Sequence, residues 1–213
     1  EFISRLKDKG YDAVVVTNHF FPWGPFMKEE DPVGTYLADY EEAKRIGEEN
    51  GIVVLLGAEF RFEENNNDYL VFGVDEAFLR ETVVRLDLTF REFYEIYHAE
   101  NRLICQAHPF RKRDYIKQIL LGLKYCDGIE TANIFNDQFA DVCAMRYAKE
   151  FDLVTIAGSD NHLSGIPDKT EAHLLYGIEL DEPLKDIHDL VSIILGRGKI
   201  GLAVPPERFV QDP

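Results

Sequence analysis

The segment VVVTNHF, residues 14–20, is the stretch on which the fold prediction depends. Its β-branched valines are typical of a buried strand, yet the run ends on the imidazole of His19. Four further apolar runs behave in the same way, because each ends on an ionisable side chain. They are IVVLLGAE ending at Glu59, LICQAH at His108, GIE at Glu130, and LVTIAGSDNH at Asp160 and His162.

Helical patterns alternate with these strands. Apolar residues at helical spacing, with Gly or Asn stop signals, predict helices at residues 34–49, 76–84, 89–100, 114–124, 138–151 and 184–196. A polar turn at 63–67 joins the runs 52–60 and 68–74 as a hairpin. This alternation is typical of a mainly parallel sheet in one α/β domain, here residues 1–213. In a barrel of parallel strands the carboxyl ends share one face, so the strand-end side chains would meet there.

Composition excludes several classes of function. The 213 residues include 39 acidic and 23 basic side chains, giving a net charge of −16, which argues against extended nucleic-acid binding. No apolar run approaches the ~18 residues that span a bilayer, and the first residues lack the pattern of a secretory signal. The three cysteines show neither disulfide nor zinc-knuckle spacing, so we expect a cytoplasmic protein. Its oligomeric state stays open.

The strand-end side chains predict a metal site. Imidazoles and carboxylates are the ligands of Zn, Mn and Fe, and a carboxylate shared between two ions relieves the repulsion among acidic groups. Taken singly, a histidine here is expected to be a hydrogen-bonded structural residue, and a glutamate to be salt-bridged. The convergence of five strand ends favours a multinuclear metal or acid–base site. In GSDNH the small Gly158 and Ser159 would let the backbone enter a crowded site, with Asp160 and His162 turned inward.

A basic cluster follows His108 directly. Arg111, Lys112 and Arg113 lie just beyond Pro109. A guanidinium at this point could bind a substrate phosphate in a bidentate manner. A solvated loop is the equally open alternative.

An aromatic loop follows His19, with Phe20, Phe21, Trp23 and Phe26 set among Pro and Gly. It could line a substrate pocket, but packing over the barrel edge or a subunit contact is the favoured interpretation. Cys105 is expected in the core and His98, His173 and His188 on the surface. Asn133 and Asn136 are candidates to hydrogen-bond ligand or substrate groups.

Several motifs together resemble the polymerase-and-histidinol-phosphatase (PHP) family of metal-dependent phosphoesterases. VTNH looks like that family's T-D-H block, LLGAE like its G-x-E, QAHP like its central His block, GIETAN like its G-I-E-x-x-N and AGSDNH like its G-S-D-x-H. The order is the same along essentially the whole chain. The family's first strand, with an H-x-H pair, has no counterpart here. Asn18 replaces the Asp of T-D-H. Asp68, where many relatives have a ligating His, could ligate as an oxygen donor or simply end a turn, and the turn is the favoured interpretation.

The resemblance implies a fold and an activity. The fold would be a distorted (β/α)7 TIM-like barrel of the PHP type, with the family's N-terminal strand absent from this sequence. It would hold two or three Zn, Mn or Fe ions and cleave phosphate esters by a metal-bound hydroxide. By position, the implied ligands are His19, Glu59, His108, Asp160 and His162, with Glu59 as the bridge. The implied catalytic residues are His108, Asp160 and Arg111.

We therefore expect a metal-dependent hydrolase of small phosphate esters, with a small phosphorylated substrate and no membrane partner. Clustered His and Asp ligands also serve amide or lactone hydrolysis, so a metal-dependent amidohydrolase-like enzyme is an alternative. A catalytically silent metal-binding or scaffold domain is a third possibility, because the first strand of the family pattern has no counterpart.

Overall fold

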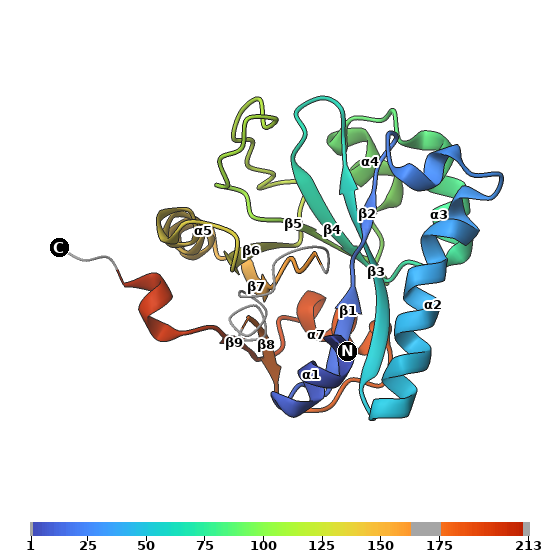
Figure 1. The fold of residues 1–213 in the computed structure, drawn as a ribbon. Helices are drawn as coiled ribbons and strands as arrows, with labels where there is room; N and C mark the ends of the chain where they lie inside the picture. The colour runs from blue at the N-terminus through green and yellow to red at the C-terminus, as the bar shows by residue number, and fades with distance from the viewer. Residues whose placement is uncertain (1, 163–175, 211–213) are drawn as a thin grey trace.

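The computed structural model describes residues 2–162 and 176–210 (Figure 1). The strands are β1 (Ala13–Val16), β2 (His19–Phe20), β3 (Val53–Arg61), β4 (Asp68–Phe72), β5 (Leu103–Gln106), β6 (Gly128–Asn133), β7 (Val154–Gly158), β8 (Gly177–Leu180) and β9 (Ile200–Ala203). The helices are α1 (Phe2–Asp8), α2 (Pro32–Asn50), α3 (Glu76–Thr82), α4 (Phe90–Tyr97), α5 (Gln138–Glu150) and α7 (Ile187–Leu195). Short 3₁₀ helices are η1 (Pro25–Lys28), η2 (Val83–Arg85) and η4 (Pro206–Phe209).

The main sheet has the order β1-β3-β4-β5-β6-β7, with β2 paired to β3 beyond β1. β1 and β2 run parallel to β3, and β5, β6 and β7 run parallel to one another. β4 is antiparallel to both of its neighbours, so the predicted hairpin is confirmed and the sheet is mixed. β8 and β9 form a separate antiparallel pair beside β7.

The sheet curls into a half-barrel. Among the described residues no pairing joins β1 to β7, so the closed (β/α)7 barrel stays a prediction while the mixed α/β architecture is confirmed. None of the helices in residues 2–162 and 176–210 combines the length and the apolar character that a bilayer crossing needs.

Local signals set the helix ends. Asp31 caps α2 by accepting from the backbone N–H of Gly34, and the helix ends at Gly51 with φ of 67°. A capping box begins α4, because the Thr89 and Glu92 side chains each accept from the backbone N–H of the other.

The helix predicted at 114–124 is wrong. Residues in this stretch form turns and irregular structure. The buried Gln106 side chain hydrogen-bonds backbone groups of this stretch. Gln106 Nε2 donates to the Leu120 carbonyl at 2.5 Å, and Gln106 Oε1 accepts from the Gly122 N–H at 3.0 Å. Lys117 Nζ also donates to the Glu63 carbonyl at 2.9 Å, which ties the segment to the turn after β3. These tertiary hydrogen bonds outweigh the local helical pattern.

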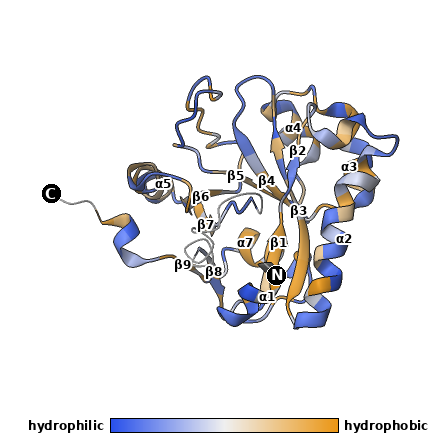
Figure 2. Cartoon of the chain, in the orientation of Figure 1, coloured by the Kyte–Doolittle hydropathy of each residue, from blue (hydrophilic) through white to orange (hydrophobic). Residues whose placement is uncertain are grey.

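Three hydrophobic clusters of the described residues pack helices against the sheet, and the smallest joins α1 and α2 to β1 and β3. The largest is aromatic and packs β3 and β4 against α2, α3 and α4, with Phe60, Phe62 and Phe93 buried at its centre. The second packs the sheet against α7 through residues such as Leu103 and Ile194. Figure 2 shows apolar residues along the strands and polar residues over much of α2.

The packing interpretation of the aromatic loop is confirmed for two of its members. Phe20 and Phe26 are buried and stack with ring centroids 5.2 Å apart, and both contact Tyr36 of α2 edge-on. Phe21 is half-buried and Trp23 is exposed. Packing therefore accounts for the inward-facing half of this loop.

The remaining minor predictions agree with the structure where it describes them. Cys105 is buried in the core, and all three cysteines are free. His98 and His188 are exposed, whereas His173 lies outside the described residues.

Candidate metal centre

Three buried side chains form the centre of the site: Glu59 on β3, Asp68 at the start of β4, and His108 just after β5. Each offers a ligand atom, and these atoms all lie within 4.8 Å of one another. The sheet brings them together, because β4 pairs with both β3 and β5. Two carboxylates and an imidazole buried together are a typical set of donors for a transition metal.

His108 is held with one ring nitrogen toward the cluster. Its Nδ1 lies 3.0 Å from Glu130 Oε2, and its backbone N–H donates to the same oxygen at 2.9 Å. Its Nε2 faces Asp68 Oδ2 at 3.1 Å and Glu59 Oε1 at 3.8 Å. A carboxylate that fixes one nitrogen while the other is presented is the usual environment of a metal-binding histidine.

Glu130 therefore has a role that the sequence left open. It orients His108 from behind and does not join the cluster itself. Asn133 donates to both Glu130 oxygens at 3.2 Å, which confirms its predicted supporting position. His108 has φ of 28°, a backbone conformation uncommon for non-Gly residues and often found at functional sites.

His19 contacts the same cluster from β2, the parallel neighbour of β3. β2 pairs with β3 so that His19 lies directly across from Glu59, and His19 Nε2 is 3.2 Å from Glu59 Oε2. The sequence thus correctly predicted that this imidazole meets the Glu59 carboxylate, although β3 continues past Glu59 to Arg61.

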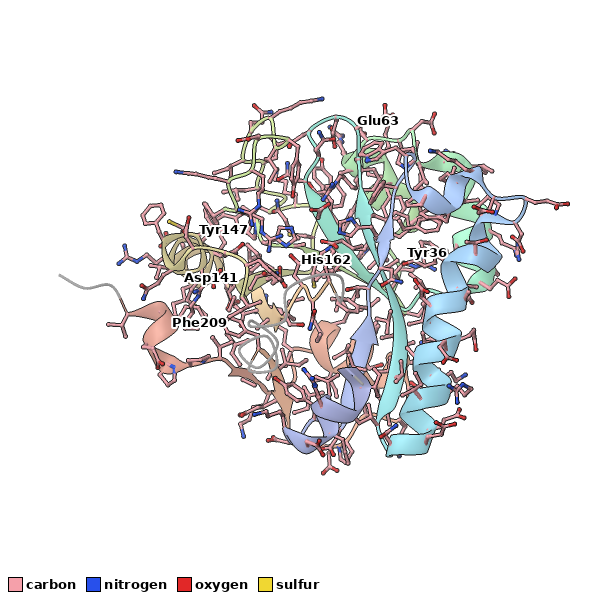
Figure 3. All side chains as sticks on the ribbon, in the orientation of Figure 1. Tyr36, Glu63, Asp141, Tyr147, His162 and Phe209 are labelled. Carbon is pink, nitrogen blue, oxygen red and sulfur yellow. The ribbon has the colours of Figure 1, made fainter. Side chains whose placement is uncertain are left out.

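His162 lies beside His19 and contacts Asp160. The two rings meet edge to face with centroids 5.3 Å apart, and His162 Nδ1 is 2.9 Å from the backbone carbonyl of Asp160. Its side chain is 57% exposed. Figure 3 places His162 near the middle of the view, among side chains from the strand ends.

Asp160 is paired with Arg111. Arg111 Nη1 donates to Asp160 Oδ2 at 2.6 Å, and Asp160 has φ of 48°. Arg111 is only 7% exposed, so the solvated-loop interpretation is wrong for it, although Lys112 and Arg113 are exposed. Asp160 and His162 thus line the same cleft as Glu59 and Asp68.

The interpretation of Asp68 as the end of a turn is wrong. Asp68 is a buried strand residue, and Arg61 across the hairpin binds both of its oxygens, at 2.5 and 2.8 Å. The Arg61 guanidinium also lies over the rings of Phe21 and Tyr115, at 5.5 and 4.8 Å from their centroids. Sequence reasoning missed Arg61. The signal was present in the hairpin, whose register sets Arg61 opposite Asp68.

The environment shifts the pKa of each member. Burial alone would raise the pKa of Asp68, but hydrogen bonds from His108 and Arg61 outweigh burial and lower it to about 2. Burial alone would lower the pKa of His108, but its bonds to Asp68 and Glu130 raise it to about 10. Burial raises the pKa of Glu59. For His19, the hydrogen bond and charge of Glu59 outweigh burial and raise the pKa. Without a metal, the proton on His108 therefore compensates the buried carboxylate of Asp68.

Glu59, Asp68 and His19 border a cleft of about 290 Å³. Its walls are formed by His19, Glu59, Arg61, Asp68, Arg111, Arg113, Tyr115, Phe135, Asp160 and His162. Three arginines among these residues, in a chain of net charge −16, concentrate positive charge around the acidic cluster. The cleft therefore combines donors for a cation with donors for an anion.

Solved structures of other proteins have a similar fold. PsfC from Pseudomonas syringae PB-5123 matches with a TM-score of 0.63 at 18% identity, over 98% of this chain and 83% of that chain. A two-domain protein of Bacteroides vulgatus ATCC 8482, containing a predicted PHP-like metal-dependent phosphoesterase, matches with a TM-score of 0.56 at 14% identity. The chain shares its fold with PHP-like metal-dependent phosphoesterases.

The match to the Bacteroides protein covers 90% of this chain and 57% of that chain. A candidate metal-dependent phosphoesterase from Bifidobacterium adolescentis ATCC 15703 also matches, with a TM-score of 0.52 at 15% identity over 93% of this chain and 90% of that chain. No family model and no curated protein sequence matches the chain. The resemblance predicted from the motifs is thus supported at the level of the PHP-like fold.

Proposed function

We propose that this protein is a metal-dependent hydrolase of small phosphate esters. The observation that carries the proposal is the buried cluster of Glu59, Asp68 and His108, bordered in one cleft by Arg61 and Arg111. A phosphate ester needs both features, because cations and guanidinium groups stabilise its charge during displacement.

The donor set fits divalent ions. Glu59, Asp68 and His108 would hold one ion, with His19 joining through its contact to Glu59. Asp160 and His162 would complete the ligands on the other side of the cleft, and two or three Zn, Mn or Fe ions are proposed in total. When bound, such ions supply Lewis-acid polarisation of the phosphoryl group and an activated water.

The protein's own residues would bind and orient the ester. Arg111 presents Nη2, a buried donor without a hydrogen-bond partner in the described structure, while its Nη1 and Nε are occupied. A phosphoryl oxygen would satisfy this donor. The cleft of about 290 Å³ suits a small substrate rather than an extended polymer. The free cysteines support a cytoplasmic location as part of the proposal.

The proposal is tested by comparing a phosphate ester with an amide as substrate. Protein loaded with Mn²⁺ or Zn²⁺ is expected to hydrolyse p-nitrophenyl phosphate and to lose that activity when a chelator removes the metal. A p-nitroanilide assayed in parallel should not be cleaved. Cleavage of the anilide alone would favour an amidohydrolase-like enzyme, and a metal-loaded protein that cleaves neither would favour a silent metal-binding domain; either result contradicts the proposal.

A further inference from the structure

Arg111 is anchored by a series of polar contacts that leads away from the cleft. Its Nε donates to Asn136 Oδ1 at 2.8 Å. Asn136 Nδ2 in turn donates to Asp141 Oδ1 at 2.6 Å, and Arg208 Nε donates to the other Asp141 oxygen at 2.6 Å. The guanidinium in the cleft is thus connected, through Asn136 and Asp141, to Arg208 near the far end of the described chain.

Arg208 belongs to η4, which lies against α5. Its Nη2 donates to the backbone carbonyls of Asn136 at 2.7 Å and Asn133 at 3.2 Å. Gln138 Nε2 also binds η4, through the Glu207 carbonyl at 2.9 Å. In Figure 1 η4 is the red helix nearest the C-terminus, and Figure 3 labels Asp141 on α5 and Phe209 in η4. The η4 helix is therefore fastened to the loop that carries Asn136.

The Asp141 carboxylate decides which way Asn136 points. Asp141 has no exposed surface, and burial raises its pKa, although hydrogen bonds from Asn136 and Arg208 oppose the rise. A carboxylate accepts hydrogen bonds and cannot donate them, so the Asn136 amide turns its NH₂ group toward Asp141. Its carbonyl oxygen is then left facing Arg111. A buried carboxylate is costly without a cationic partner, and Arg208 is that partner.

The result at the cleft is a guanidinium with one donor to spare. Asn136 takes Nε, Asp160 takes Nη1, and Nη2 is buried and unpartnered in the described structure. Rotation of Arg111 would break the bond to Asn136, so the direction of Nη2 depends on that amide.

We propose that Arg208 is a positioning residue for anion binding: through Asp141 and Asn136 it holds Arg111 in the orientation that receives the substrate phosphoryl group. This inference rests on the proposed function, because Arg111 is the group that meets the substrate. It makes the C-terminal η4 helix part of the substrate-binding apparatus, although Arg208 does not line the cleft.

The experiment compares Arg208→Ala and Asn136→Ala with the unchanged protein. The readouts are binding of inorganic phosphate by calorimetry to the metal-loaded protein, and KM and kcat for p-nitrophenyl phosphate. Both variants are expected to weaken phosphate binding and raise KM roughly tenfold, the size typical of coupled neighbours, with kcat within about twofold. Asn136→Ala removes the link between Asp141 and Arg111 but leaves the Arg208–Asp141 ion pair in place. This variant therefore tests the inference even if Arg208→Ala folds poorly.

Arg197→Ala is the matched control. Arg197 also ties the C-terminal part of the chain to the segment after α5, through an ion pair with Asp152, but neither residue lines the cleft. The Arg197→Ala variant is expected to leave phosphate binding and KM unchanged. If the unchanged protein hydrolyses the ester, and the Arg208 and Asn136 variants bind phosphate as tightly while melting at lower temperature, Arg208 is only structural and this inference is overturned. If the unchanged protein neither binds phosphate nor cleaves the ester, the proposed function fails as well.

Discussion

Replacing His108 by alanine is expected to lower turnover of p-nitrophenyl phosphate by at least about a hundredfold and to reduce the bound divalent metal. His108 is the one imidazole of the buried cluster, and Glu130 holds it in place by two contacts. Even loss of an outer partner of a metal ligand costs about 10–100-fold, so loss of the ligand itself should cost more. Steady-state kinetics and metal content by mass spectrometry check the result.

His98→Ala is the control for this substitution. His98 also contacts a carboxylate, with its Nε2 2.9 Å from Asp127 Oδ1, but it is exposed and lies outside the cleft. It should leave metal content and turnover unchanged. The fold of His108→Ala is expected to persist, because His108 belongs to none of the hydrophobic clusters of the described residues, although loss of its bonds to Asp68 and Glu130 should lower the melting temperature. Full activity with an unchanged metal content in His108→Ala would refute the assignment of His108 as a ligand.

The second large effect is the pH dependence of metal binding. In the metal-free protein the His108 pKa is raised to about 10, so its imidazole carries a proton at neutral pH. A metal can use Nε2 only after that proton leaves, and binding therefore releases it. The apparent metal affinity should rise about tenfold for each pH unit between roughly pH 6.5 and 9. Competition with a chromophoric chelator measures this slope, and an affinity that is flat over the same range would contradict it.

The stability of the metal-free protein should change with pH in the opposite direction to the metal affinity, falling as pH rises. The His108 pKa in the folded chain is about 10 against an ordinary value of 6.5, so its contribution to stability is complete below pH 6.5 and is lost as pH rises through 10. The Asp68 pKa is about 2 against 3.8, so its contribution is present above pH 3.8 and is lost as pH falls through 2. The metal-free protein should therefore melt at progressively lower temperature above pH 6.5, while the metal-loaded protein should resist this decline.

The strand ends were predictable because their signal is local. A β-branched run followed by His or Glu predicts a strand and a side chain near its carboxyl end, and the alternation of elements places these side chains on one face. The strand bounds themselves differ, because β3 runs past Glu59 to Arg61 and β6 past Glu130 to Asn133. His19, Glu59 and His108 meet accordingly.

The partners of these residues were not predictable in the same way. The pairing of Arg61 with Asp68 depends on the register of a hairpin, and a shift of one residue would turn either side chain to the other face. The proposed orientation of Arg111 depends on Arg208, which lies 97 positions later in the sequence. No strand pattern around Arg208 indicates that connection. The helix predicted at 114–124 is wrong for a similar reason, because the distant Gln106 side chain hydrogen-bonds the backbone of Leu120 and Gly122.

The most direct test is anomalous diffraction from crystals of the protein grown with Mn²⁺ or Zn²⁺. We predict an anomalous peak between Glu59, Asp68 and His108, with donor atoms at about 2.0–2.3 Å and His108 Nε2 among them. A cleft without any anomalous peak at saturating metal, in which His108 still bridges Asp68 and Glu130 as it does here, would contradict the central claim.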